Sequence, residues 1–262
     1  MKKSTRTLLT ALLSLGLVIG LAGSLFSLLQ DQAGEESREE AAQTAGLAEQ
    51  VEVQPETEAP STDLPKDPVA EVMARVDLAA LQEENPDVLG WISIPDTVIS
   101  YPFLQGEDND YYLRRTWQGE KNTAGCIFLD SEVSPDFSDF STIIYGHRMR
   151  NETMFGTLKY YEDPAYFAAH PSVYIMTEAS VRRYDIFAAY ETEVSAICYG
   201  LGISSTTTKQ AFLDFAAERS VIESNVSVST SDQILTMSTC PAAGYETRWV
   251  VQAVLKQEWP ID

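Results

Sequence analysis

Basic side chains are scarce in this sequence. Its 262 residues include 18 Lys and Arg against 39 Asp and Glu, which gives a formal net charge of −21. A surface this negative repels phosphate backbones, so the composition excludes general nucleic-acid binding and provides no attraction to anionic lipid headgroups. Histidine is limited to two residues and cysteine to three. A zinc site of cysteine and histidine ligands, or a cysteine nucleophile, therefore has few candidate side chains.

The cysteines and histidines also lack metal-binding spacing. Cys126, Cys198 and Cys240 are isolated from one another, and neither His147 nor His170 lies at zinc-finger distance from a cysteine. We therefore predict no metal and no cofactor. Three cysteines are an odd number, so at least one cannot be paired within the chain.

Charge is absent from Thr7 to Gln30, a run of 24 residues dominated by Leu, Ile, Val, Ala and Gly. At about 1.5 Å per residue, a helix of this length spans roughly 30 Å of hydrocarbon. Basic residues precede the run and acids follow it, which places the N-terminus in the cytoplasm. We predict that residues 1–30 form a cytoplasmic tip and a single-pass membrane anchor, with the rest of the chain extracellular. A cleaved secretory signal is the alternative, with a small-residue site at Gly20-Leu21-Ala22.

Aromatic side chains are missing from residues 31–67, which are rich in Glu, Gln, Ala, Pro, Ser and Thr. Such a segment cannot offset its ordering entropy by burial. We predict a disordered, self-repelling acidic stalk there, followed by a catalytic domain over residues 68–262.

The residues after the stalk have the sequence pattern of a single β-rich domain. Asp67 and Pro68 predict the start of a helix over residues 68–84. Short runs of β-branched and aromatic residues then predict strands over residues 89–94, 124–129, 142–145, 172–177, 184–190, 234–238 and 249–255. Two helical inserts are predicted over residues 154–162 and 206–223. These elements favour an antiparallel barrel or sandwich with peripheral helices.

Cys240 differs from the other two cysteines in its position. Cys126 and Cys198 lie among apolar residues of strand character and are predicted to be structural. Cys240 stands where a predicted strand ends and a loop begins, which holds a side chain rigidly while leaving it accessible. We therefore regard Cys240 as the candidate nucleophile.

A thiol is mostly protonated at neutral pH, so a cysteine nucleophile needs an imidazole or a cation nearby. His147 follows the predicted strand at 142–145, and Arg248 precedes the strand at 249–255. If the strands that carry Cys240 and Arg248 form a hairpin, the guanidinium can bind the oxyanion of a tetrahedral intermediate. His170 has no such context and is predicted to be structural.

Several segments, in order along the chain, resemble one family. The residues Thr-Met-Ser-Thr-Cys at 236–240 are similar to the Thr-Leu-x-Thr-Cys signature of sortases, with Met in place of Leu. Tyr-Gly-His at 145–147, followed by Met-Phe-Gly-Thr-Leu at 154–158, resembles the class B histidine segment. Arg248 lies eight residues after the cysteine, as the arginine of the family does within a residue or two. Residues 85–92 and 108–113 are also similar to class B segments, so the resemblance covers roughly residues 70–256.

The resemblance to class B sortases implies a mainly β fold, a single eight-stranded barrel, and a thiol transpeptidase on the outer face of a Gram-positive cell membrane. It implies that Cys240 attacks the Thr carbonyl in a C-terminal sorting signal of secreted proteins. His147 would protonate the leaving amine and later deprotonate the acceptor, an amine of a peptidoglycan precursor or cross-bridge. Arg248 would stabilise the oxyanion. The residues expected to line the peptide groove are Asn109, Leu113 and Ser238.

Two other functions are compatible with the composition. A secreted cysteine endopeptidase would use the same nucleophile with water as acceptor, but papain-like enzymes place the cysteine before the histidine, whereas His147 precedes Cys240 here. A non-enzymatic surface-binding β-barrel would bury Cys240 as a structural residue.

Overall fold

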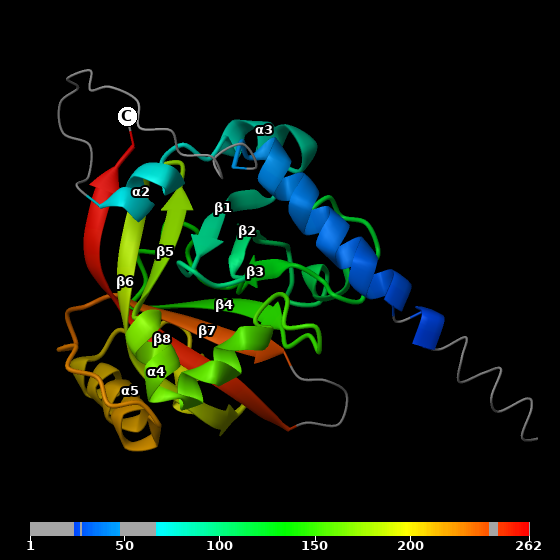
Figure 1. Ribbon diagram of the computed structural model, residues 1–262. Helices are drawn as coiled ribbons and strands as arrows, with labels where there is room; N and C mark the ends of the chain where they lie inside the picture. The colour runs from blue at the N-terminus through cyan, green and yellow to red at the C-terminus, as the bar shows by residue number, and fades with distance from the viewer. Residues whose placement is uncertain (1–23, 27, 48–66, 241–245, 262) are drawn as a thin grey trace, which may run out of the picture.

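The computed structural model of this chain describes residues 24–26, 28–47, 67–240 and 246–261. Within these residues, eight strands close into one barrel in the order β1-β2-β3-β4-β7-β8-β6-β5 (Figure 1). The strands are β1 Val88–Ser93, β2 Ser100–Leu104, β3 Ile127–Leu129, β4 Ser141–His147, β5 Ser172–Thr177, β6 Ser180–Glu193, β7 Ile234–Cys240 and β8 Thr247–Pro260. The eight-stranded barrel implied by the resemblance is therefore confirmed.

The prediction of a purely antiparallel sheet is wrong. β2 pairs with β3 in parallel, and β4 pairs with β7 in parallel, while the other neighbours are antiparallel. Parallel neighbours require long crossover connections, and the chain from β4 to β7 contains two further strands and several helices. The helical segments are α2 Pro68–Met73, α3 Leu78–Glu84, η1 Tyr112–Arg114, η2 Gly156–Glu162, α4 Pro164–Ala169, η3 Ile197–Tyr199 and α5 Thr206–Arg219.

Two local predictions need correction. The helix expected over residues 68–84 is divided into α2 and α3, because Asp77 caps a second helix by accepting a hydrogen bond from the Ala80 amide at 3.0 Å. Strand β2 was not predicted, since Pro102 lies at its centre and proline removes a ladder donor. The structure tolerates this proline opposite Trp91 of β1. The remaining predicted strands are present, with ends that differ by a few residues.

The interior of the barrel is filled by aliphatic and aromatic side chains from every part of the sheet. Those with no exposed surface include Ile92, Phe103, Leu129, Ile144, Ile175, Ile186, Leu235 and Val251. At about 25 cal/mol per Å² of apolar surface removed from water, this core is the dominant stabilising contribution. The core therefore fixes the strand ends on which the candidate catalytic residues lie.

The prediction of a disordered stalk is wrong for residues 31–47. Residues 24–26 and 28–44 are helical, and we call them the N-terminal helix. Its buried residues are Gly34, Ser37, Ala41 and, just past its end, Ala45, at spacings of three and four that form one face. The prediction failed because the acids Glu35, Glu36, Glu39 and Glu40 dominate the composition, whereas they lie on the exposed face of this helix. The rest of the predicted stalk, residues 48–66, lies outside the described residues.

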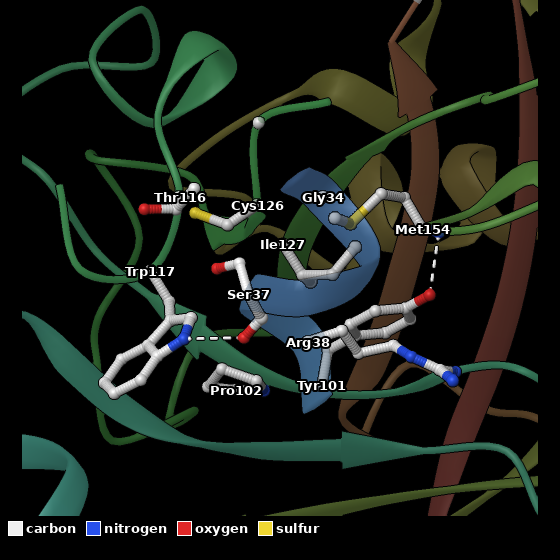
Figure 2. A pocket seen from close by; sticks show the side chains of 11 residues that line it. Gly34, Ser37, Arg38, Tyr101, Pro102, Thr116, Trp117, Cys126, Ile127 and Met154 are labelled. Atoms are coloured by element: carbon white, nitrogen blue, oxygen red, sulfur yellow. Dashed lines mark hydrogen bonds between the residues drawn. The ribbon is translucent and has the colours of Figure 1, made fainter. Parts of the chain in front are cut away.

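The N-terminal helix packs closely against the barrel. Trp117 donates its indole Nε1–H to the Ser37 carbonyl at 2.9 Å, and the Arg38 guanidinium lies over the Tyr101 ring (Figure 2). The Ser37 hydroxyl donates to Gln118 Oε1 at 3.0 Å. The remaining cavity in this seam is about 20 Å³, the size of one water molecule. The helix is therefore an integral part of the folded structure.

In the described part of the chain, no helix combines the length and the apolar character that a bilayer crossing requires. Residues 1–23 and 27 of the predicted cytoplasmic tip and membrane anchor lie outside that part.

The buried face of the N-terminal helix gives a direct test. Ala41→Glu would place a carboxylate where Ala41 has no exposed surface, so we expect the free energy of unfolding to fall by about 2–4 kcal/mol. Gln43→Glu is the matched control, because Gln43 is exposed on the same helix, and its effect should stay within about 0.5 kcal/mol. Urea denaturation of both variants measures the difference. Equal stability of the two would show that the helix does not pack as described.

Candidate active site

The parallel pairing of β4 with β7 brings the candidate base and nucleophile together. The register runs from Ser141 opposite Ile234 to His147 opposite Cys240, so the last residues of both strands are direct neighbours. Neighbouring strands lie about 4.8 Å apart, so the backbones of the two residues lie side by side. Two residues far apart in sequence are thus neighbours at one end of the barrel.

Arg248 reaches the same edge from β8. β7 and β8 are antiparallel, as expected for the predicted hairpin, and their ladder ends with Ser238 opposite Val250. Beyond it, the Trp249 amide donates to Thr239 Oγ1 at 3.0 Å, which continues the connection between the strands. The same register, extended to the end of β7, sets Arg248 level with Cys240. The Arg248 side chain is half-buried, and its Nη1 donates to the Thr247 carbonyl at 3.3 Å.

The His147 ring is held by the loop that follows β2. Its Nε2 lies 2.6 Å from the Leu113 carbonyl oxygen, which can only accept, so Nε2 carries a hydrogen. In the neutral ring Nδ1 is then the basic atom. Gly125 packs at the same edge of the ring, where an added Cβ would lie 2.7 Å from the Leu113 carbonyl oxygen and 3.0 Å from His147 Cδ2, and its φ of +61° also favours glycine.

The surroundings of His147 favour its neutral form. Burial lowers the pKa of His147 below its usual value, and the positive charge of Arg114 lowers the pKa further. The hydrogen bond to the Leu113 carbonyl acts in the opposite direction, since it stabilises the protonated ring. The net lowering of the pKa supplies a free base at neutral pH, which is what proton removal from a thiol requires.

The residues expected to line a peptide groove occupy three different situations. Asn109 is half-buried and holds its own loop, since its Nδ2 donates to Asp130 Oδ2 at 3.1 Å and its Oδ1 accepts from the Ser131 amide at 2.8 Å. Leu113 is half-buried beside His147. Ser238 has no exposed surface, and its hydroxyl is 2.8 Å from that of Tyr199. Contact of these three residues with a peptide remains a prediction. Because Ser238 is buried, it would act on a peptide indirectly, by holding Tyr199.

Asp130 was not singled out from the sequence. Its side chain is 3% exposed, and Oδ2 accepts from both Asn109 and the hydroxyl of Tyr145, the latter at 2.9 Å. Tyr145 lies two residues before His147 on β4. Asp130 therefore fastens the Asn109 loop to the catalytic strand. The Tyr-Gly-His segment hinted at a role for Tyr145, but nothing in the sequence identified its distant partner.

The other cysteines are buried in the barrel wall and its helical cover. Burial raises the pKa of the Cys126 thiol and raises the pKa of Cys198 to about 11. Both are free thiols. Among the described residues, no group of three His, Cys, Asp or Glu side chains is arranged to hold a metal ion.

Known proteins are similar to this chain in sequence and in fold. A family model described as "Sortase domain" matches residues 92–256. Sortase B of Listeria monocytogenes is 40% identical over 183 residues, which cover 69% of this chain and 74% of the relative. The chain belongs to the sortase family, class B. Sortase B of Staphylococcus aureus is 31% identical over 182 residues, 70% of this chain and 75% of the relative. Class B sortases are cysteine transpeptidases, so this chain is an enzyme of that kind.

Solved structures of class B sortases have the same fold. Sortase B from B. anthracis, in complex with AAEK1, superposes with a TM-score of 0.72 at 31% identity, covering 88% of this chain and 99% of that one. A substrate complex of Staphylococcus aureus sortase B gives a TM-score of 0.72 at 26% identity, covering 87% of this chain and 99% of that one. The shared region includes the barrel and extends beyond it.

The ionisation of His147 can be measured directly. We expect NMR titration of this sortase to give a His147 pKa below 6.5, its usual value, because burial disfavours the imidazolium. Arg114→Gln should raise that pKa, since it removes a nearby positive charge. Arg115→Gln is the matched control and should leave it unchanged, because Arg115 is not among the groups that shift it. A chain with His170→Asn assigns the signal. An unchanged His147 pKa in Arg114→Gln would show that the charge of Arg114 does not contribute to the lowering.

Proposed function

We propose that this class B sortase cleaves a C-terminal sorting signal of secreted proteins after Thr and transfers the acyl group to a cell-wall amine. The observation that carries the proposal is the register that sets His147 opposite Cys240 at the ends of two parallel strands. Arg248, level with them on β8, supplies a permanent positive charge. The acceptor would be an amine of a peptidoglycan precursor or cross-bridge.

The first half-reaction forms a thioester. The Cys240 thiol gives its proton to Nδ1 of neutral His147, and the sulfur attacks the Thr carbonyl carbon. Arg248 stabilises the oxyanion of the tetrahedral intermediate. The intermediate collapses as the C–N bond breaks, and the departing nitrogen takes the proton from the imidazolium. The lowered pKa of His147 favours this return of the proton, because the imidazolium is the stronger acid.

The second half-reaction reverses the proton path. The acceptor amine attacks the thioester carbon, the C–S bond breaks, and the amine proton passes through His147 to the Cys240 sulfur. No oxidant or cofactor is needed, since the electron count is unchanged. Another solved sortase B structure is a complex with triglycine, which makes a glycine amine the first acceptor to test. Asn109, Leu113 and Ser238 would line the peptide groove.

The proposed location is the outer face of the cell membrane. The uncharged run from Thr7 to Gln30 would form a single-pass anchor with a cytoplasmic N-terminus, because basic residues precede the run and acids follow it. The enzyme would then meet secreted substrates as they emerge beside the membrane.

Peptide assays with and without an amine donor test this function. A panel of fluorogenic pentapeptides of the Asn/Ser/Pro-Pro-x-Thr kind should yield a cleaved product, and with triglycine a ligated product, both identified by mass spectrometry. Cleavage that never produced a ligated peptide would identify an endopeptidase instead.

Cys240→Ala should abolish both cleavage and transfer, because it removes the nucleophile. Cys126→Ser and Cys198→Ser are matched controls, since both thiols are buried, and these variants should change stability more than turnover. Thermal unfolding and turnover are measured on all three. Full activity in Cys240→Ala would end the assignment of Cys240.

Arg248 and His147 should fail in different ways. Arg248→Lys keeps the charge but loses the forked donor geometry, and loss of one oxyanion donor typically costs about 10²–10³ in rate. Arg150→Lys is the matched control, because Arg150 is exposed on the loop after His147. His147→Ala should stop both half-reactions and also alter the rate at which iodoacetamide labels Cys240. Wild-type turnover in Arg248→Lys would contradict the role of Arg248, and backbone amides would then have to stabilise the oxyanion.

A further inference from the structure

The first turns of the N-terminal helix carry an unusual set of exposed apolar side chains. Their exposed fractions are 59% for Leu25, 59% for Phe26, 61% for Leu28 and 54% for Leu29. Contiguous large apolar side chains this exposed mark an interaction site. They are also among the last residues of the uncharged run that begins at Thr7, so the sequence before them supplies more apolar surface. Their natural environment is therefore lipid.

The same helix is fixed along its length to the segment between β2 and β3 and to the start of α3. Near its start, Gln30 Oε1 accepts from the Thr123 amide at 3.1 Å. At its middle, the Ser37 carbonyl accepts from Trp117, and just past its end the Ala45 carbonyl accepts from the Asp77 amide at 3.1 Å. Three attachment points along one helix prevent it from pivoting on the barrel.

The attachment point nearest the apolar end adjoins the catalytic base. Gly34 packs on Ala124, where an added Cβ would lie 3.2 Å from the Ala124 Cβ, and Gly125 contacts the His147 ring. Thr123 is two residues from Gly125, at most about 7 Å along the chain. Figure 1 shows the helix leaving the barrel on the side where β4 and β7 end. The apolar end and the active site thus share one side of the molecule.

We propose that Leu25, Phe26, Leu28 and Leu29 insert into the outer surface of the lipid bilayer. The N-terminal helix is then a rigid strut that holds the His147–Cys240 end of the barrel facing that surface. This inference rests on the membrane anchor proposed above, to which it adds a fixed orientation and height of the active site.

Charge sets the depth of the insertion. Asp31 directly follows Gln30, and Glu35 and Glu36 lie one turn further on, with both glutamates exposed. Moving a carboxylate into hydrocarbon is costly, so the lipid boundary falls close to Gln30. His147 then lies on the order of 20 Å or less from the headgroups, given the short chain path through Thr123 and Gly125. A peptide bond just outside the membrane would be within its reach, and a distant one would not.

Energy transfer to a lipid dye tests the orientation. The full-length chain with Cys240→Ala is labelled on a single new thiol, at Asn151→Cys in the loop after His147 or at Glu178→Cys in the β5–β6 turn. Both positions are exposed, whereas Cys126 and Cys198 are buried. Each protein is reconstituted in phosphatidylcholine–phosphatidylglycerol vesicles that carry a headgroup acceptor dye. A second pair of proteins contains a flexible Gly/Ser insertion of about twelve residues between Leu29 and Gln30.

The β5–β6 turn lies toward the Ala45 end of the helix, because Met176 and Val181 on either side of the turn share an apolar cluster with Ala45. The helix rises about 22 Å between Gln30 and Ala45, so we expect transfer from position 151 to exceed transfer from position 178 by about two-fold or more. The insertion should abolish this difference. Equal transfer from both positions in the uninterrupted chain, or a difference that survives the insertion, would overturn the strut. Failure of the protein to float with vesicles would instead overturn the anchor itself. Peptide cleavage by the unlabelled enzyme is measured separately and reports on the transpeptidase assignment alone.

Discussion

The parallel pairing of β4 with β7 is the constraint on which the active site depends. Parallel strands end at the same edge of a sheet, so His147 and Cys240 meet there. In an antiparallel pair of strands of this length, the two ends would be separated by roughly 20 Å. Because β8 runs antiparallel to β7, Arg248 returns to the same edge. One topological choice thus assembles all three proposed catalytic residues.

That topology also explains the long connection between the two strands. The chain leaves β4 at His147 and reaches β7 only at Ile234, after η2, α4, β5, β6, η3 and α5. Strands β5 and β6 complete the barrel, and α5 packs against β6 through Phe212 and Ala216, in a separate apolar cluster that also contains Val250 and Val254 of β8. The crossover therefore supplies the strands that close the barrel.

Local patterns predicted the parts of this molecule whose causes are local. Seven of the strands, the Asp67 cap and the hairpin between β7 and β8 follow from residue types in short windows, and each is present, although the strand ends differ by a few residues. The parallel pairings could not be predicted this way, because they depend on which distant segments meet. β2 was not predicted because proline is unfavourable inside a strand. In the structure, Pro102 is accommodated in β2 opposite Trp91 of β1. The family resemblance supplied the strand count that periodicity alone did not.

The N-terminal helix shows how composition can conceal an amphipathic pattern. Its glutamates suggested a solvated stalk, while Gly34, Ser37, Ala41 and Ala45 form a face of small side chains that brings the helix close to the barrel. Small residues bury little area each, so their contribution to hydropathy is weak even when their packing is tight. The loop that this helix covers also carries Leu113, whose carbonyl holds His147. One loop therefore connects the packing of the helix to the orientation of the base. A substitution that shifts the helix will also shift the His147 ring.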